Sequence, residues 1–318
     1  MNKLIALITI ALFAASCSDD NNSNGTDDQD LVSPALEMSV STTSGQSPLT
    51  GILTVAPCKV NSSIYYGNYV NGQLTPFDGY YKVKDGTFLE GAVNREISLP
   101  TGTYNMIYWG TPQYKEPIYA NPAVREAALT IGSDLSQQAL TLIKVSADTI
   151  FYPVFDLVHA VQPANIGTES LKASLKRVVA GLKVTVKDKD NGVLSSSIDS
   201  MAVRVTNIYS GLNYYTGKAQ GTPCTIAFPL VRSTDGTQMG NATVMLFPSS
   251  GKPEFQLSII LKNGAVKSFK QTLTTPFTAN TRLNLTLSLG DIFSDQTSGD
   301  FNVDNWKEEN ENINVPNV

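Results

Sequence analysis

The chain has 318 residues, of which 16% are charged, and a formal net charge of −5. When the first 16 residues are set aside, Lys3 goes with them, and 22 basic and 28 acidic residues are left. Six acidic residues between Ser18 and Glu37 account for this excess, so the chain from Met38 onward is balanced at 22 against 22. A balanced body gives no electrostatic case for nucleic-acid binding or for a basic patch on lipid headgroups.

The N-terminus carries a processing signal. Lys3 precedes an almost unbroken apolar run, Leu4 to Ala15, which is shorter than the roughly 20 residues that span a bilayer. Ala14-Ala15-Ser16 directly before Cys17 resembles a bacterial lipobox, in which a peptidase cuts before the cysteine and acyl chains are attached to it. An ordinary signal peptide cut at an Ala-x-Ala site is the alternative. We expect a lipoprotein signal peptide over residues 1–16 and lipidation of Cys17, whose acyl chains would hold the protein to a membrane.

Residues 17–45 are predicted to form a lipidated acidic tether. Between Ser18 and Glu37 the sequence has acidic residues and no basic residue, among Asn, Ser and Gly. Such a composition cannot bury enough apolar surface to offset its ordering entropy, so we expect disorder there.

The rest of the chain shows the patterns of β-structure. Apolar and polar residues alternate with period two in four segments, residues 182–186, 201–205, 255–261 and 283–289. Asp-Gly or Asn-Gly pairs, which favour hairpin turns, occur at residues 85–86, 191–192, 235–236 and 263–264. One short helix is predicted from Glu169 to Lys176, where Leu171 and Leu175 lie four residues apart. Short strands with few helices predict antiparallel β-sandwiches.

Two domains are predicted. Pro163–Gly167 interrupts the strand pattern, and we place the junction there. An N-terminal β-sandwich is expected over residues 46–165, and a C-terminal β-sandwich with a polar tail over residues 166–318.

Residues suited to catalysis are scarce. His159 is the only histidine, so no histidine cluster can bind a metal, and a Ser–His–Asp triad would have to use this residue without a nucleophile-elbow motif. A structural histidine at a strand edge is the favoured interpretation. Paired carboxylates of a glycosidase depend on three-dimensional approach and stay open. The sequence predicts a non-enzymatic protein with no metal and no cofactor.

The cysteines leave two alternatives open. With Cys17 lipidated, Cys58 and Cys224 are an even pair in an oxidising compartment. They form either a disulfide between the two halves or two small buried thiols, since a free cysteine behaves as a small hydrophobic residue.

Aromatic residues crowd the first half of the chain. Exposed, they could stack on sugar rings; buried, they would fill a sandwich core, which strand positions favour. Tyr104 and Tyr108 share one face of a predicted strand with Met106. Ile107 and Trp109 lie on its other face, so both faces are apolar and a central strand is expected. The aromatic residues concerned are Tyr65, Tyr66, Tyr69, Tyr80, Tyr81, Tyr104, Tyr108, Trp109, Tyr114 and Tyr119.

Three passages together resemble the fimbrillin superfamily, the pilus subunits of Bacteroidales type V pili. They are the lipobox with its acidic tether (Cys17-Ser18-Asp19-Asp20), the turn Leu99–Tyr104, and Phe155–Ala160 followed by Leu175–Val184. The resemblance covers most of the chain from about Thr50 onward and is closest to the lipid-anchored anchor and accessory subunits. It implies an all-β fold of two tandem transthyretin-like antiparallel β-sandwich domains, after a lipoprotein signal peptide and a disordered tether.

The resemblance also implies a mode of assembly. In stalk subunits of the superfamily, an arginine-specific protease removes the N-terminal strand, and a C-terminal strand of the next subunit fills the groove by β-strand addition. Here no Lys or Arg lies between Lys3 and Lys59, and the first arginine is Arg95. The protease therefore has no site that would free the first strand. The implied role is a fimbrial anchor or accessory subunit at the outer membrane or in a surface-exposed fimbrium, with other fimbrial subunits as partners.

The C-terminus holds a candidate donor strand. Ile313, Val315 and Val318 follow an acidic stretch, and Ile313 and Val315 alternate with a polar residue. A polar tail that frays is the alternative. Because Pro316 has no N–H to donate, an inserted strand must end near Val315 or run along an edge there.

A binding function is the main alternative. A surface lipoprotein could capture a host or bacterial surface glycan with the exposed aromatic side chains of its first domain. An exposed, coplanar pair of aromatic rings would favour this interpretation.

Overall fold

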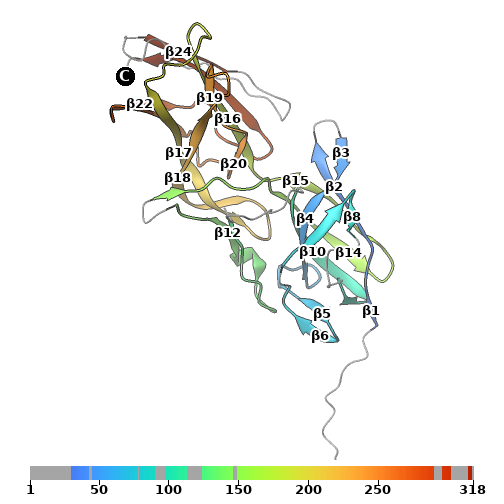
Figure 1. Cartoon of the computed structure of the whole chain (residues 1–318). Helices are drawn as coiled ribbons and strands as arrows, with labels where there is room; N and C mark the ends of the chain where they lie inside the picture. The colour runs from blue at the N-terminus through green and yellow to red at the C-terminus, as the bar shows by residue number, and fades with distance from the viewer. Residues whose placement is uncertain are drawn as a thin grey trace, which may run out of the picture. The chain divides into compact units, whose positions relative to one another are not determined.

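The computed structural model describes residues 30–42, 45–77, 79–89, 97–112, 124–145, 149–289, 296–301 and 314–316, the last two ranges by their backbone alone (Figure 1). All of the strands lie in one compact unit, Leu31–Val318. The described residues form strands, turns and irregular segments, with a single turn of 3-10 helix at Leu135–Gln137. The predicted all-β class is confirmed. In this part of the chain, no helix is long and apolar enough to cross a membrane.

An eight-stranded sheet combines two stretches of the chain that are distant in sequence. In spatial order its strands are β3 (Gly45–Pro48), β2 (Leu36–Thr42), β15 (Leu171–Arg177), β14 (Val158–Ile166), β10 (Gly102–Thr111), β4 (Gly51–Cys58), β7 (Tyr81–Lys84) and β8 (Thr87–Phe88). The pairings are antiparallel except for β2 with β15, which run parallel. Two short antiparallel pairs join β1 (Leu31–Val32) to β9 (Leu99–Pro100) and β5 (Asn68–Val70) to β6 (Gln73–Thr75).

A thirteen-stranded sheet takes up most of the remaining chain. Along its main path lie β11 (Val124–Arg125), β12 (Ala139–Leu142), β17 (Ile198–Asn213), β18 (Ala219–Arg232), β19 (Gln238–Gly240), β16 (Ala180–Asp188), β23 (Arg282–Leu289), β24 (Gln296–Phe301) and β25 (Asn314–Pro316). Off this path are β13 (Ile150–Phe151), β20 (Val244–Leu246), β21 (Glu254–Leu261) and β22 (Val266–Thr272). The four segments with predicted period-two alternation are confirmed as strands, in β16, β17, β21 and β23.

The buried apolar side chains form two clusters, which we call the small core and the large core. The small core draws on the eight-stranded sheet, and the large core draws mainly on the thirteen-stranded sheet. β10 contributes to both: Met106 and Tyr108 face the small core, whereas Ile107 and Trp109 face the large core. The prediction of a central strand with two apolar faces is therefore confirmed for β10.

The predicted hairpin turns are confirmed in three of four places. Residues 85–86 join β7 to β8, residues 235–236 lie between β18 and β19, and residues 263–264 join β21 to β22. Residues 191–192 are the exception, since β16 and the following β17 do not pair. Asp85 and Gly86 both have positive φ, 51° and 84°, which is the backbone that a type I′ turn requires.

The helix predicted from Glu169 to Lys176 is wrong, because Leu171–Arg177 forms β15. Leu171 and Leu175 are both buried, with Ala173 buried between them. A spacing of four places two residues on one face of a strand as well as on one face of a helix, so this pair could not distinguish the two.

The disordered tether predicted over residues 17–45 is wrong for part of its length. Leu31–Val32 forms β1 and Leu36–Thr42 forms β2, while residues 17–29 lie outside the described residues. The acidic composition concealed a period-two pattern, in which Leu36, Met38 and Val40 are buried.

The predicted junction at residues 165/166 falls inside β14, before its last residue, and β14 and β15 belong to the same sheet. After β15, the chain passes to the thirteen-stranded sheet between Arg177 and Ala180. It also visits that sheet earlier, in β11–β13, before it returns to the eight-stranded sheet. The division into domains 46–165 and 166–318 stays a prediction. Each of the two large sheets contains strands from both sides of this boundary.

Candidate functional site

The N-terminal strand β2 is an integral part of the eight-stranded sheet. Leu36, Met38 and Val40 are 2–5% exposed and belong to the small core. The residues between them point the other way, with Glu37 exposed and Ser39 half-buried. β2 lies parallel to β15, and residues 36–40 are opposite residues 171–175. β2 thus shares a core with residues as distant in sequence as Leu175.

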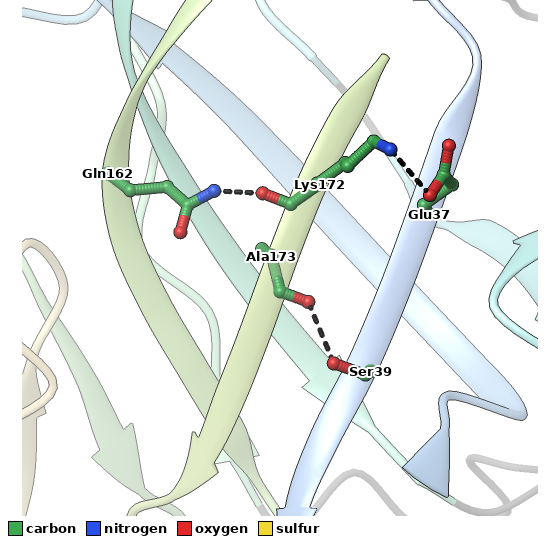
Figure 2. Close-up of polar contacts among 5 residues, drawn as sticks. All are labelled: Glu37, Ser39, Gln162, Lys172 and Ala173. Atoms are coloured by element: carbon green, nitrogen blue, oxygen red, sulfur yellow. Dashed lines mark hydrogen bonds and ion pairs between the residues drawn. The ribbon is translucent and has the colours of Figure 1, made fainter. Parts of the chain in front are cut away.

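Polar contacts on the outer face also join β2 to β15 (Figure 2). The Lys172 Nζ atom lies 3.0 Å from the Glu37 Oε2 atom, and the Ser39 Oγ atom donates to the Ala173 carbonyl at 3.4 Å. On the other side of β15, the Gln162 amide donates to the Lys172 carbonyl. The Lys172–Glu37 side chains are 65% and 53% exposed, so this ion pair contributes little to stability. Burial of the apolar face is the larger contribution to holding β2.

The second edge of β2 is also hydrogen-bonded, so β2 is not an edge strand. The Met38 N–H donates to the Gly86 carbonyl at 2.8 Å, and the Leu49 N–H donates to the Met38 carbonyl at 2.9 Å. The Gly86 N–H in turn donates to the Leu49 carbonyl at 2.9 Å. Farther along, residues 39–42 pair with β3. Two backbone segments, residues 45–49 and Gly86, therefore hold the side of β2 that faces away from β15.

A buried ion pair ties the end of β15 to the segment before β14. The Arg177 guanidinium donates to both carboxylate oxygens of Asp156, at 2.6 Å and 2.7 Å. Both side chains are 13% exposed. The bidentate geometry fixes β15 at the end where it pairs with β14.

His159 is buried within a strand, and the predicted position at a strand edge is wrong. It lies opposite Trp109 on one side and opposite Lys176 on the other, and it is 6% exposed. Its ring centroid lies 4.6 Å from that of Trp109. Burial lowers its pKa to about 4, and a hydrogen bond with the Tyr215 backbone opposes this only in part. A histidine that stays neutral and lacks access to solvent is poorly suited to acid–base catalysis.

The β17–β18 hairpin turn contacts β10 and β14 at this histidine. The Trp109 Nε1–H donates to the Tyr214 carbonyl at 2.9 Å, and the Asn105 side-chain amide donates to the Tyr215 hydroxyl at 2.6 Å. Gly217 has a φ of +69°, and a Cβ atom there would lie 2.7 Å from the His159 Nδ1 atom. The turn therefore fits closely against the eight-stranded sheet, and His159 is part of its packing.

The two downstream cysteines are free thiols, so the disulfide alternative is not what the structure has. Cys58 is buried in β4 and Cys224 is half-buried in β18, strands of different sheets. Burial, together with the charge of Asp134, raises the pKa of Cys58 to about 12, and burial raises the pKa of Cys224 to about 11. Both are protonated at neutral pH and have little nucleophilic character.

Most of the aromatic side chains that could bind sugar fill the cores. Among the described ones, Tyr80 is 37% exposed, but the rings that approach a parallel arrangement, Phe77 and Tyr81, are 7% and 1% exposed. Tyr66 and Tyr104 meet edge to face. Five members of the predicted set are buried: Tyr65, Tyr81, Tyr104, Tyr108 and Trp109. Tyr114 and Tyr119 lie outside the described residues. The described part of the chain shows no exposed coplanar pair.

The C-terminal strands extend one edge of the thirteen-stranded sheet. β23 alternates buried leucines with polar residues, β24 pairs with it, and β25 pairs with β24. Val315 lies in β25 opposite Thr297, so this member of the candidate donor strand is paired with the chain's own sheet. Ile313, Val318 and the lipidation candidate Cys17 lie outside the described residues.

A family model described as fimbrillin-A associated anchor proteins Mfa1 and Mfa2 matches residues 29–312 of this sequence. The chain belongs to this family. The match confirms the resemblance to anchor subunits that the sequence passages indicated. Fimbrial anchor proteins have an adhesion-related role, associate with other fimbrial subunits and belong to cell-surface pili. A comparison with curated proteins finds no match.

Solved structures are similar to this fimbrial anchor family member at low identity, and a match with a TM-score above 0.5 shows the fold. A Bacteroides ovatus protein proposed to be an adhesin is 12% identical to this chain, with a TM-score of 0.52. The match covers 87% of this chain and 95% of that one. The fimbrial anchor protein Mfa2 from Porphyromonas gingivalis is 14% identical, with a TM-score of 0.48, over 79% and 88%. A proposed polysaccharide binding protein from Bacteroides thetaiotaomicron is 14% identical, with a TM-score of 0.48, over 83% and 92%.

The pairing of β2 with β15 and its contact with Gly86 were not predicted from the sequence. The alternation of Leu36, Met38 and Val40 with polar residues could have indicated the strand. Nothing in the sequence indicated its partner, because residues 36–40 and 171–175 are more than 130 positions apart.

Proposed function

We propose that the chain is a non-catalytic fimbrial anchor or accessory subunit, held at the outer membrane by lipid on Cys17 and joined to pilus subunits by β-strand addition. The observation that supports this most is the retained N-terminal strand. β2 fills the small core with three apolar side chains and is hydrogen-bonded on both edges. No Lys or Arg between Lys3 and Lys59 offers a trypsin-like protease a site to release it.

The retained strand has a consequence for assembly. A sheet position that the chain's own strand occupies cannot accept a donor strand from another subunit. A subunit closed in this way can form a junction only through another edge, and a subunit with one junction terminates a fibre. This is the behaviour expected of an anchor at the base of a pilus.

β25 is the edge that we assign to the remaining junction. Its pairing with β24 covers only residues 314–316, opposite residues 296–298. Pro316 has no N–H, so it adds no donor to the ladder. A short terminal strand at a sheet edge loses few hydrogen bonds when it detaches, and it can then pair with another chain.

Deleting residues 312–318 tests the junction. We expect both sheets to stay folded, with little change in melting temperature, because few ladder hydrogen bonds are lost. We also expect the truncated protein to lose its fimbrial partner in a pull-down of tagged protein from outer membranes, with the captured proteins identified by mass spectrometry.

A double variant, Asn310→Ser with Asn312→Ser, serves as the control, since it keeps the length and charge of the tail and should capture the partner like the full chain. A truncated protein that still captures its partner would remove the role of the tail. A large drop in melting temperature would show that β25 is a structural part of its own sheet.

Replacing Cys17 with alanine tests the anchor. We expect the variant to be unacylated and released from the membrane fraction, because two acyl signals are needed for stable attachment and both depend on this cysteine. Cys224→Ala is the matched control and should stay in the membrane fraction. The measurement is incorporation of labelled palmitate together with fractionation of cell membranes. A Cys17→Ala protein that is still labelled and still membrane-bound would contradict the lipid anchor.

A further inference from the structure

The Asp85-Gly86 turn reaches β2 although it belongs to the β7–β8 hairpin. Its backbone takes part in a closed set of three hydrogen bonds, in which Met38 donates to Gly86, Gly86 to Leu49, and Leu49 to Met38, at 2.8–2.9 Å. Met38 is the central residue of the stretch that pairs with β15. The turn therefore contacts β2 at its midpoint, from the side opposite β15.

Gly86 is the residue that makes this contact feasible. Its φ is +84°, a backbone conformation that favours glycine, and an added Cβ atom would lie 2.8 Å from the Met38 carbonyl oxygen. Asp85, with a φ of 51°, donates its N–H to the Thr50 Oγ1 atom at 3.1 Å. A hydrogen bond to Thr50 thus fixes the turn. The turn contacts β2 through Gly86, where the space beside the Met38 carbonyl is too small for a side chain.

We propose that the Asp85-Gly86 turn is a clasp that keeps the N-terminal strand in its sheet. Besides apolar burial, β2 is held by its parallel pairing with β15, by β3 toward its end, and by this turn at its centre. Opening the clasp would leave the Met38 N–H without its Gly86 acceptor, and an unmade buried hydrogen bond favours departure of the strand. The significance of the clasp rests on the proposed function: a released β2 would expose β15 and the small core to a donor strand without any proteolysis.

Gly86→Ala tests the clasp, with Gly72→Ala as the matched control. Both glycines follow an Asn or Asp in a tight turn and have positive φ, but nothing lies within 4 Å of a Cβ atom at Gly72. The control therefore carries the backbone strain of the substitution without the clash against β2. Hydrogen–deuterium exchange by mass spectrometry, on the purified chain without any partner, is the measurement.

We expect Gly86→Ala to speed exchange of the amides in residues 36–42 and 171–175 by at least about tenfold, because both strands lose their partner when β2 leaves. The Leu171 N–H, for example, donates to the Ala35 carbonyl, three residues before Met38, and the turn takes no part in this bond. Strands β16 and β23 of the thirteen-stranded sheet should exchange as in the wild type, and so should every segment in Gly72→Ala outside residues 68–75. Faster exchange at Met38, Leu49 and Gly86 alone would overturn the proposal, since β2 would then stay in place without the clasp.

Thr50→Val is the milder second variant, in case Gly86→Ala loosens the whole chain. It removes only the acceptor of the Asp85 N–H and keeps the shape of the side chain. Selectively faster exchange in β2 and β15 supports the clasp, and exchange that is unchanged or raised everywhere overturns it. These results do not depend on partner capture, so a failed pull-down would count against the proposed junction and leave the clasp intact.

Discussion

Replacing Met38 with alanine is expected to lower the free energy of unfolding by about 2–5 kcal/mol, because a large-to-small change in a packed core loses transfer free energy and leaves a cavity. Met38 is 2% exposed and belongs to the small core. The small core also contains residues of β15 and of the strands around β10. A cavity at Met38 is therefore expected to weaken the packing of segments that are distant in sequence. Urea denaturation of the purified protein gives the free energy.

Ser39→Ala is the matched control for this substitution. Ser39 lies on the outer face of β2, and its hydroxyl makes long hydrogen bonds of 3.2 Å and 3.4 Å, to Gln46 and Ala173. We expect a change within about 0.5 kcal/mol, as for most surface substitutions. If Met38→Ala also changed stability by less than about 1 kcal/mol, β2 would not contribute to the folded core, and the argument that the chain retains its N-terminal strand would lose its basis.

Local sequence patterns were sufficient to predict the strands in which apolar and polar residues alternate regularly. In β23, the leucines at positions 283, 285, 287 and 289 are buried, and the polar residues between them are half-buried. The pattern failed at β15, where Leu171 and Leu175 fit a helix and a strand equally well. A β-branched or aromatic residue between them would have favoured the strand, but Ala173 favours a helix and Ser174 gives no strand signal.

The acidic composition gave a wrong boundary for the predicted tether, because it was averaged over too many residues. The acidic residues of the predicted tether extend to Glu37, yet Glu37 is an outward-facing residue of β2 whose neighbours are buried. A single charge on the exposed face of a strand is compatible with burial of the other face. Charge density therefore could not locate the residue where the predicted tether ends, and residues 17–29 lie outside the described residues.

The contacts between residues that are distant in sequence could not be predicted from the sequence. The parallel pairing of β2 with β15, and the approach of Gly86 to Met38, depend on how separate segments are placed side by side. The same holds for His159, whose burial follows from the β17–β18 turn that lies against it. Neither its neighbours in sequence nor its spacing from other polar residues indicates this contact.

Lowering the pH from 6.5 to 4 is expected to remove up to about 3 kcal/mol from the free energy of unfolding through His159 alone. Burial lowers the pKa of His159 to about 4 in the folded chain, from 6.5 in the unfolded one. Between these values the unfolded chain binds a proton that the folded chain does not bind. Stability contributed by the neutral ring is therefore complete above pH 6.5, falls as the pH falls, and has been lost once the pH is below about 4.

Other charged groups near this window can be separated from His159. Lys176, its cross-strand neighbour, is exposed. Hydrogen bonds from neighbouring serine and threonine residues lower the pKa of Asp134 and of Asp235 below the usual 3.8, so these two carboxyls lose their contribution only at lower pH. The packed rings of Trp109 and Tyr214 carry no charge between pH 4 and 6.5.

His159→Gln removes the titrating group while keeping a side chain that can donate to the Tyr215 backbone. We expect this variant to be less stable than the wild type at pH 7, because the ring contact with Trp109 is lost, but its stability should change much less between pH 6.5 and pH 4. Urea denaturation of both proteins at a series of pH values measures the two slopes. Parallel slopes would show that His159 is accessible to protons in the folded chain, and the close fit of the β17–β18 turn over its ring would then be wrong.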